Sequence, residues 1–195
     1  MKLCLIAMWF MLLVVNGAAA QKKNVPPPPK PGDDGPSLEV TMKFIQDKLN
    51  GIGPVNFVTY YHDNIEGRDW ALQWNVEVTR VAADARSCRI AFHRKAMGDN
   101  GVVTEDKDHG FAMKDVGQIA VMTMEQVKKE KATANRQPAW SFKIDPPVFA
   151  LQVRKTDAKE SDEFDFFDEQ MANRVAKAML HAVELCGGGS KPEPF

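Results

Sequence analysis

Basic side chains gather around one histidine in the middle of the chain. In RSCRIAFHRKAM (residues 86–97), Arg89, His93 and Lys95 alternate with apolar residues, and Arg80 lies in the preceding segment. If both segments are strands, the alternating side chains share one outward face, where guanidinium and ammonium groups can bind an anion. The sequence therefore predicts an anion site on these four residues. The alternative, an ordinary solvated sheet face, is the more common arrangement.

Two acidic segments supply carboxylates that a cation could use. DNGVVTEDKDH (residues 99–109) lacks the glycine and the twelfth-position glutamate of an EF-hand loop. KESDEFDFFDEQ (residues 159–170) leads into a predicted helix start, where the helix dipole favours negative charge without any metal. We expect a flexible acidic loop in the first segment, and we predict no metal site and no cofactor.

The sequence contains no recognisable catalytic motif. There is no G-x-S-x-G elbow, and GIG (residues 51–53) is too short for a phosphate loop and ends a helix. The histidines show neither H-x-H nor H-E-x-x-H spacing: they are His62, His93, His109 and His181. We therefore predict no catalytic residue, and a hydrolase whose site assembles only in three dimensions stays open.

The first twenty residues predict export. Lys2 precedes an apolar run (residues 3–15), and NGAAA (residues 16–20) ends in small residues of the A-x-A type. The run is shorter than the roughly 20 apolar residues of a bilayer span. We expect cleavage after Ala20, which also removes Cys4, leaves no transmembrane segment and places the protein in the periplasm or outside the cell. An uncleaved anchor is the alternative.

Two cysteines remain after this cleavage, Cys88 and Cys186. Cys88 is in phase with Ile90 on the apolar face of a predicted strand. Cys186 continues the apolar stripe of a helix that begins after Asp168 and ends at Gly187. In an oxidising compartment, two thiols that face one core favour a disulfide, and separate buried cysteines are the alternative. Closing a loop of about 100 residues is worth about 4.7 kcal/mol in the chain-entropy model.

Proline and charge content divide the chain into segments. QKKNVPPPPKPGDDGP (residues 21–36) favours an extended polyproline spacer. Residues 37–190 suit one globular domain, and residues 191–195 form a tail. The net charge of −1 excludes the strongly basic surface that nucleic-acid binding requires. The sequence leaves the oligomeric state open.

Apolar spacing predicts a helix followed by strands. The helix begins at Ser37, a good N-cap, and ends at Asn50-Gly51. Alternation predicts strands over residues 55–61, 71–81 and 86–97. Residues 102–116 predict one or two short strands around the acidic loop.

In the second half of the chain, the residue pattern gives a less definite secondary structure. IAVMTMEQVKKEK (residues 119–131) opens with β-branched residues and favours a strand, although its Met, Glu, Gln and Lys content makes a helix the alternative. AWSFKI (residues 139–144) and VFALQVRKT (residues 148–156) predict a second hairpin with a proline corner at Asp145-Pro146-Pro147.

The order of a helix, about seven strands and an amphipathic C-terminal helix predicts an α+β fold. It resembles the pleckstrin-homology-like fold, a bent antiparallel β-barrel capped by its last helix. SLEVTMKFIQ (residues 37–46) and RVAKAMLHAVELCGG (residues 174–188), with a cysteine in an earlier strand, also resemble a family of uncharacterised exported bacterial proteins. The resemblance covers about residues 37–188 and implies no catalytic motif. An open antiparallel sheet with both helices on one face is the alternative.

These observations predict an exported, non-enzymatic binding or scaffold module whose partner is an unknown protein or small ligand. One alternative is a carrier of a lipid or small apolar ligand. Its internal cavity would be lined by Trp74, Phe92, Phe142 and Phe149. The other alternative is the hydrolase described above.

Overall fold

The computed structural model describes residues 35–136, 139–158 and 161–188. The predicted signal peptide (residues 1–20), nearly all of the predicted linker (residues 21–36) and the predicted tail (residues 191–195) lie outside the described residues. The chain divides into Met1–Gly35 and Pro36–Phe195, and the fold belongs to the second unit. Within the described residues, no helix combines the length and apolar character needed to cross a membrane.

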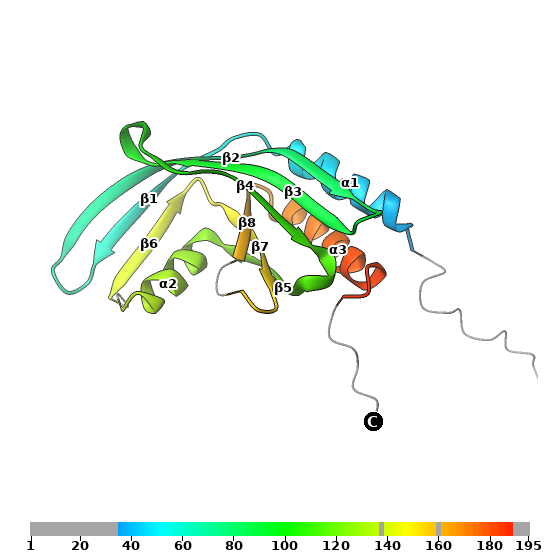
Figure 1. Cartoon of the computed structure of the whole chain (residues 1–195). Helices are drawn as coiled ribbons and strands as arrows, with labels where there is room; N and C mark the ends of the chain where they lie inside the picture. The colour runs from blue at the N-terminus through cyan, green and yellow to red at the C-terminus, as the bar shows by residue number, and fades with distance from the viewer. Residues whose placement is uncertain (1–34, 137–138, 159–160, 189–195) are drawn as a thin grey trace, which may run out of the picture. The chain divides into compact units, whose positions relative to one another are not determined.

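The described residues of this unit form three α-helices and eight strands, which confirms the α+β class (Figure 1). The helices are α1 (Leu38–Asn50), α2 (Met124–Ala134) and α3 (Glu169–Leu185). The strands are β1 (Val55–Asp63), β2 (Arg68–Asp84), β3 (Arg89–Met97), β4 (Val103–Ala112), β5 (Val116–Thr123), β6 (Trp140–Asp145), β7 (Phe149–Lys155) and β8 (Ser161–Phe166).

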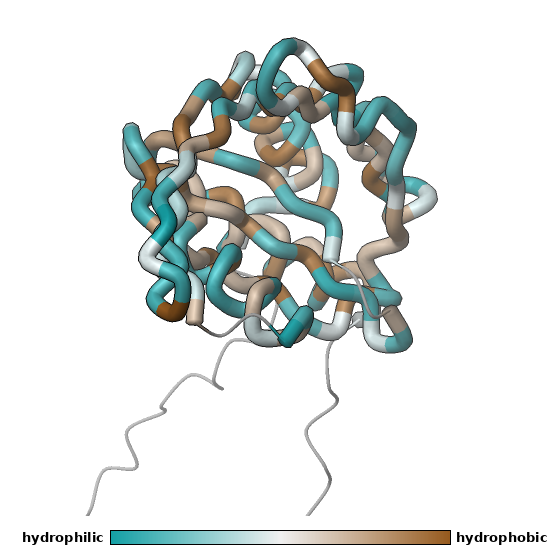
Figure 2. Tube along the Cα trace, turned by 90° about the vertical axis from the view of Figure 1, so that its left-hand side faces the viewer, coloured by the Kyte–Doolittle hydropathy of each residue, from teal (hydrophilic) through white to brown (hydrophobic). Residues whose placement is uncertain are grey.

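The strands form two antiparallel sheets, one with the order β4-β3-β2-β1-β6 and one with the order β5-β7-β8. These sheets are not closed into a barrel, so the bent barrel expected from the resemblance is not formed. The alternative of a single open sheet also differs, because the strands divide between two sheets. Apolar and polar residues alternate along the chain trace in Figure 2, as expected of sheets with one covered face.

The predicted hairpin of residues 139–144 and 148–156 is wrong. β6 pairs with β1, with Ile144 opposite Thr59, whereas Leu151 of β7 lies between Val121 of β5 and Phe164 of β8. The two prolines that precede β7 have no backbone N–H for a sheet ladder. The chain therefore leaves one sheet and enters the other at this corner.

The segment over residues 119–131 is a strand only up to Thr123, so the favoured strand is wrong for its second half. Thr123 begins α2 with a reciprocal cap: its hydroxyl accepts from the Gln126 N–H, and the Gln126 side chain accepts from the Thr123 N–H. Such a capping box satisfies two free backbone donors and favours a helix start. Helix α2 carries the two lysines that reach the site described below.

One acidic stretch differs from expectation, and a second contains a strand that was not predicted. Residues 99–109 are not a flexible loop, because β4 takes up most of them and pairs with β3 in register from Arg89 to Ala96, with a shift at Met97. The acidic run before the last helix contains β8. Both stretches are therefore ordered strands, and the carboxylates of both strands take part in ion pairs with neighbouring elements.

Two hydrophobic clusters hold the elements together. The larger cluster joins α1 and α3 to β2, β3 and the three-stranded sheet, and includes Met42, Ile90, Leu151, Phe164 and Met179. The smaller cluster lies between α2 and the strands β1, β2 and β6, and includes Phe57, Val76, Val127 and Ile144. Burying one such side chain contributes about 1.5–3 kcal/mol. The predicted N-caps are confirmed, since Ser37 and Asp168 each accept a backbone N–H of the following helix.

A bulge in β2 re-aims one of the predicted site residues. The pairing with β3 shifts between Thr79 and Ala82, and Arg80 between them has φ 54°. Beyond the bulge, Val81 exchanges two hydrogen bonds of 2.9 Å with the Asn50 side chain at the end of α1. The extra residue allows Val81 to face the core while Arg80 reaches the outer face of β4.

The predicted Cys88–Cys186 disulfide is confirmed, with the two sulfur atoms 2.07 Å apart. Cys88, however, lies in the turn that precedes Arg89 with φ 51°, and not in the strand as expected. Cys186 follows α3 directly, and Gly187 after it has φ 75°, as expected of a helix end. The bond joins the β2–β3 turn to the end of the last helix.

Candidate functional site

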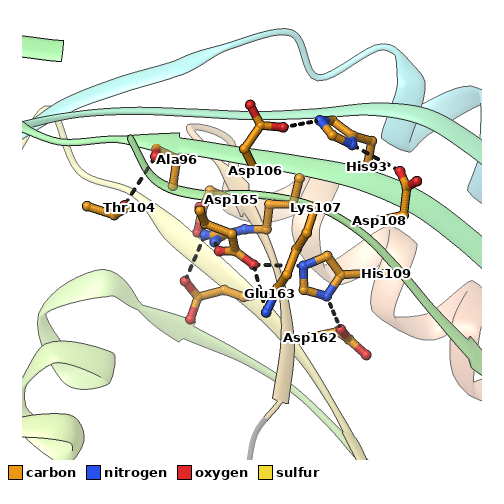
Figure 3. A network of polar contacts seen from close by, with 12 residues as sticks. His93, Ala96, Thr104, Asp106, Lys107, Asp108, His109, Asp162, Glu163 and Asp165 are labelled. Carbon is orange, nitrogen blue, oxygen red and sulfur yellow. Dashed lines mark hydrogen bonds and ion pairs between the residues drawn. The ribbon is translucent and has the colours of Figure 1, made fainter. Parts of the chain in front are cut away.

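The outward face of β3 carries three of the four predicted anion-binding residues, Arg89, His93 and Lys95, which lie opposite Ala112, Asp108 and Asp106 of β4. The structure brings His93 and Arg80 together on one carboxylate. Asp108 Oδ1 lies 2.8 Å from Arg80 Nη2 and 2.9 Å from His93 Nδ1. Asp106 Oδ1 lies 3.0 Å from His93 Nε2. We call Arg80, His93, Asp106 and Asp108 the outer cluster, and Figure 3 shows His93 between Asp106 and Asp108.

Two of the four predicted residues, Arg80 and His93, are therefore already paired with carboxylates of the protein. Among the described residues, neither Arg89 nor Lys95 forms an ion pair with the outer cluster. The hydrogen bond from His93 and the charge of Arg80 hold the pKa of Asp108 below its ordinary value. An external anion at this face would have to displace Asp108 from both of its partners.

A second polar group lies on the opposite face of the same two strands. Arg94 of β3 points inward, in phase with the buried Phe92 and Ala96, and its side chain is only 12% exposed. It contacts Glu105 of β4, and its Nη2 atom lies 3.4 Å from Glu163 Oε1 and 3.3 Å from Asp165 Oδ2, both on β8. Burial alone would lower the pKa of Arg94, but these three carboxylates raise it, so the guanidinium stays charged.

His109 extends this group from one sheet to the other. Its Nε2 atom lies 2.7 Å from Glu105 Oε1, and its Nδ1 atom lies 3.0 Å from Asp162 Oδ1 on β8. The imidazole ring stacks on Phe92, with ring centres 5.1 Å apart. In the imidazolium form both ring nitrogens donate, so one side chain can serve both carboxylates. We call Arg94, Glu105, His109, Asp162, Glu163 and Asp165 the inner network (Figure 3).

Burial perturbs one group of this network and one lysine beside it. The carboxyl group of Asp165 is almost completely enclosed, and burial together with the charge of Glu163 raises its pKa to about 7, although Arg94 opposes this. Burial and the neighbouring charge of Lys131 lower the pKa of Lys128 to about 8. The Lys128 ammonium lies 4.3 Å above the ring of Trp74. Glu105 shows the opposite balance, because Arg94 and His109 outweigh burial and lower its pKa.

The inner network, apart from the enclosed Asp165, forms the floor of a cleft of about 1250 Å³ between β4, β7, β8 and α2. Three lysines from three of these elements line its rim. Lys155 Nζ of β7 lies 3.9 Å from Asp162, Lys107 Nζ of β4 lies 3.8 Å from Glu105, and Lys131 Nζ of α2 lies 3.5 Å from Glu163. Basic and acidic side chains thus alternate across the cleft, joined in the middle by the His109 ring, in the order Lys155, Asp162, His109, Glu105, Arg94, Glu163 and Lys131.

The arrangement suits polar binding better than any of the chemistries weighed from the sequence. Within the described ranges, no three His, Cys, Asp or Glu side chains converge to hold a metal. The thiols of Cys88 and Cys186 are joined in the disulfide. The four residues of the expected apolar cavity lie apart: Phe92 packs on Phe164 and His109, Phe142 on Tyr61, and Trp74 under Lys128, while Phe149 packs against the larger core.

Comparison of the chain with protein-family models, with curated proteins and with solved structures gave no match. The geometry of the cleft therefore has to carry the functional argument.

Proposed function

We propose that the protein is an exported, non-enzymatic binding module and that its ligand site is the cleft between β4, β7, β8 and α2. The observation that carries this proposal is the fixed charge pattern of the cleft. Ion pairs between three elements hold the floor carboxylates in place, while the lysines at the rim keep only long contacts of 3.5–3.9 Å. Because the floor is already held in place and only the rim lysines have to move, a bound ligand orders few side chains. The loss of conformational entropy on binding is therefore small.

Export is part of the proposal and is supported by two features. The first twenty residues have the composition of a cleavable signal peptide, and Cys88 and Cys186 form a disulfide that an oxidising compartment maintains. The two helical segments that resemble uncharacterised exported bacterial proteins agree with this placement. Fold resemblance alone does not determine a ligand, so the cleft remains the basis of the proposal.

The described residues of the cleft do not supply a general base for the hydrolase alternative. A general base needs a free ring nitrogen or carboxylate within reach of the substrate. Both ring nitrogens of His109 face carboxylates of the protein, and the perturbed carboxyl group of Asp165 is enclosed beneath Arg94. Among the described residues, no serine or threonine hydroxyl is hydrogen-bonded to a histidine.

Native intact mass spectrometry of the protein purified from the host envelope tests the proposal. We expect a chain that begins at Gln21, two cysteines that do not react with alkylating reagent without reductant, and an additional mass that is lost on denaturation. In the double variant Lys107→Glu with Lys131→Glu, which reverses two charges at the rim, the additional mass should disappear. The matched control is Arg89→Glu with Lys95→Glu on the outward face, which should retain it.

The opposite result would contradict the proposed site. If the outward-face variant loses the additional mass and the cleft variant keeps it, the ligand binds at the predicted anion site of β3. An uncleaved chain would contradict the expected cleavage after Ala20, and two reactive thiols would contradict the oxidising compartment.

A further inference from the structure

We infer that the cleft binds a small ligand that carries both a cationic nitrogen group and a carboxylate, as a short peptide with free ends does. The inference rests on the proposed function and names the ligand class for the same site. It depends on three features: the balance of charges around the cleft, one carboxylate oxygen without a donor, and the loose contacts of the rim lysines.

The charges that line the cleft are balanced in number, and its lysines are more exposed than its innermost carboxylates. Five Lys and Arg side chains and five Asp and Glu side chains line it, including Asp106 of the outer cluster. Glu105, Asp162 and Glu163 lie deep, with side chains 9–20% exposed, whereas the rim lysines are 40–62% exposed. A ligand with charges of only one sign would leave the other sign of the cleft uncompensated, which is costly near a buried group. A ligand with both signs matches the floor and the rim together.

Asp162 provides the place for the cationic end. Its Oδ1 atom accepts from His109, but its Oδ2 atom is buried and has no hydrogen-bond donor in the described part of the chain. The cation nearest to Oδ2 is Lys155 Nζ at 3.9 Å, beyond hydrogen-bond distance. A buried carboxylate oxygen without a donor costs free energy that a ligand N–H can recover. Asp162 also lines the cleft, so the missing donor can come from the ligand.

Lys155 provides a mechanism for exchanging partners. Its ammonium covers Asp162 Oδ2 without bonding to it, and its side chain is 40% exposed and able to turn outward. A ligand ammonium can take this position beside Asp162, while Lys155 turns to the ligand carboxylate. Lys107 and Lys131 hold their carboxylates at similarly long distances and can assist. Each charge that loses a partner in this exchange gains another from the ligand.

The size and neutral lining of the cleft fit a short peptide. Small-ligand pockets typically enclose about 300–1,000 Å³, and this cleft of about 1250 Å³ is open on one side, so it has room for a few residues. Thr104, Gln152 and Ser161 line it as well. Their hydroxyl and amide groups can hydrogen-bond to peptide N–H and C=O groups without selecting a side chain.

Isothermal titration calorimetry with three related peptides tests the inference on the purified, disulfide-bonded protein. Triglycine carries both charges, N-acetyltriglycine lacks the cation, and triglycinamide lacks the carboxylate. We expect triglycine to bind at least about tenfold more tightly than either blocked peptide, because each blocked end removes one charged contact.

Two variants assign the ends of the peptide. In Lys155→Gln, triglycine and triglycinamide should bind with nearly equal affinity, because the carboxylate loses its cation. In Asp162→Asn, triglycine and N-acetyltriglycine should become nearly equal. Lys155→Gln changes a partly exposed side chain and keeps the test valid if Asp162→Asn fails to fold. Lys95→Gln on the outward face is the matched control and should keep the full tenfold preference.

Two results would overturn the inference. If N-acetyltriglycine binds as tightly as triglycine to the unmodified protein, the cleft recognises an anion only. If none of the three peptides binds, the cleft does not take a peptide-like bipolar ligand. A co-purified mass that is lost in the rim double variant would then still support the proposed binding module, so the two failures can be told apart.

Discussion

The paired strands β3 and β4 carry the same polar arrangement on both of their faces, with different surroundings. On the outward face, His93 lies between Asp106 and Asp108, and on the inward face His109 lies between Glu105 and Asp162. The carboxylates around His93 are 49% and 77% exposed, whereas those around His109 are 20% and 9% exposed. The distances between histidine and carboxylate are therefore similar on the two faces, but the outer carboxylates are exposed to water and the inner ones are largely buried.

The outer cluster and the inner network contribute differently to the fold. The outer cluster joins strands that backbone hydrogen bonds already pair, and water weakens its charges. The inner network joins β3 and β4 of one sheet to β8 of the other, which share no ladder in the described residues. The inner contacts therefore fix the separation of the two sheets at the cleft. The outer contacts lie on a sheet face that would form without them.

The largest difference between the two faces is expected in the free energy of unfolding when Arg94 and Arg89 of β3 are replaced. Arg94→Met should lower the free energy of unfolding by about 3–5 kcal/mol, because it leaves buried carboxylates without their cation. Arg89→Met removes an exposed arginine from the outward face of the same strand and should change it by less than about 0.5 kcal/mol. Urea titration at neutral pH, followed by tryptophan fluorescence with the disulfide intact, measures both.

A loss below about 1 kcal/mol for Arg94→Met would contradict the comparison, since that is the value expected of an exposed ion pair. The slope of the urea transition should stay constant, because both variants keep the same strand and expose a similar surface on unfolding.

The second difference concerns the pH dependence of stability. The pKa of Asp165 is about 7 in the folded state and near the ordinary aspartate value of 3.8 when unfolded, so between these values the folded protein binds more protons. Its contribution to stability is therefore present below about pH 4 and lost as the pH rises through 7. Relative to Asp165→Asn, the unmodified protein should lose on the order of 4 kcal/mol between about pH 4 and pH 8.

Asp108 of the outer cluster is the matched control, with the opposite sign. Because His93 and Arg80 lower its pKa in the folded state, its contribution is present above its unfolded pKa and is lost as the pH falls. Relative to Asp108→Asn, the unmodified protein should therefore gain stability with rising pH. Urea midpoints measured across this range test both signs, and parallel curves for the two variants would contradict the assignment.

The third difference concerns the two histidines. His109→Gln should lower the free energy of unfolding by about 1–2 kcal/mol at neutral pH, because the amide cannot serve both Glu105 and Asp162 and leaves one buried acceptor without a donor. His93→Gln should cost less than about 0.5 kcal/mol, because water can reach Asp106 and Asp108. Thermal unfolding of both variants at the same pH measures the difference, and equal losses would mean that the two faces are equally hydrated.

Local signals in the sequence predicted much of the fold. Ser37 and Asp168 indicated both helix starts, and alternation placed Arg89, His93 and Lys95 on one outward face. These features depend on neighbours a few residues away. The partners of β6 and β7 were predicted wrongly, because strand pairing depends on contacts between distant segments that a hydrophobic pattern does not encode.

The inner network was missed because its members come from three separate stretches of the chain. Two local signals pointed to it. Arg94 falls in phase with Ile90 and Phe92, so an arginine on the core-facing side of β3 needed buried acceptors. The acidic run before the last helix alternates at Phe164, Asp165 and Phe166, which is the pattern of a strand and not of a loop. The inward arginine and the alternating acids together would have predicted their pairing.

The smallest difference is expected for the dependence of these losses on salt. At 1 M salt the Debye length falls to about 3 Å from about 10 Å at 0.1 M, which screens exposed charges far more than enclosed ones. The small loss caused by His93→Gln should therefore vanish at 1 M NaCl, while the loss caused by His109→Gln should largely remain, because protein atoms and not ions surround that ring. Urea titrations at the two salt concentrations measure this without the added ionic strength of guanidinium. If the His109 loss also vanishes, water and ions enter the cleft floor freely, and the floor carboxylates cannot hold the fixed charge pattern on which ligand binding in the cleft depends.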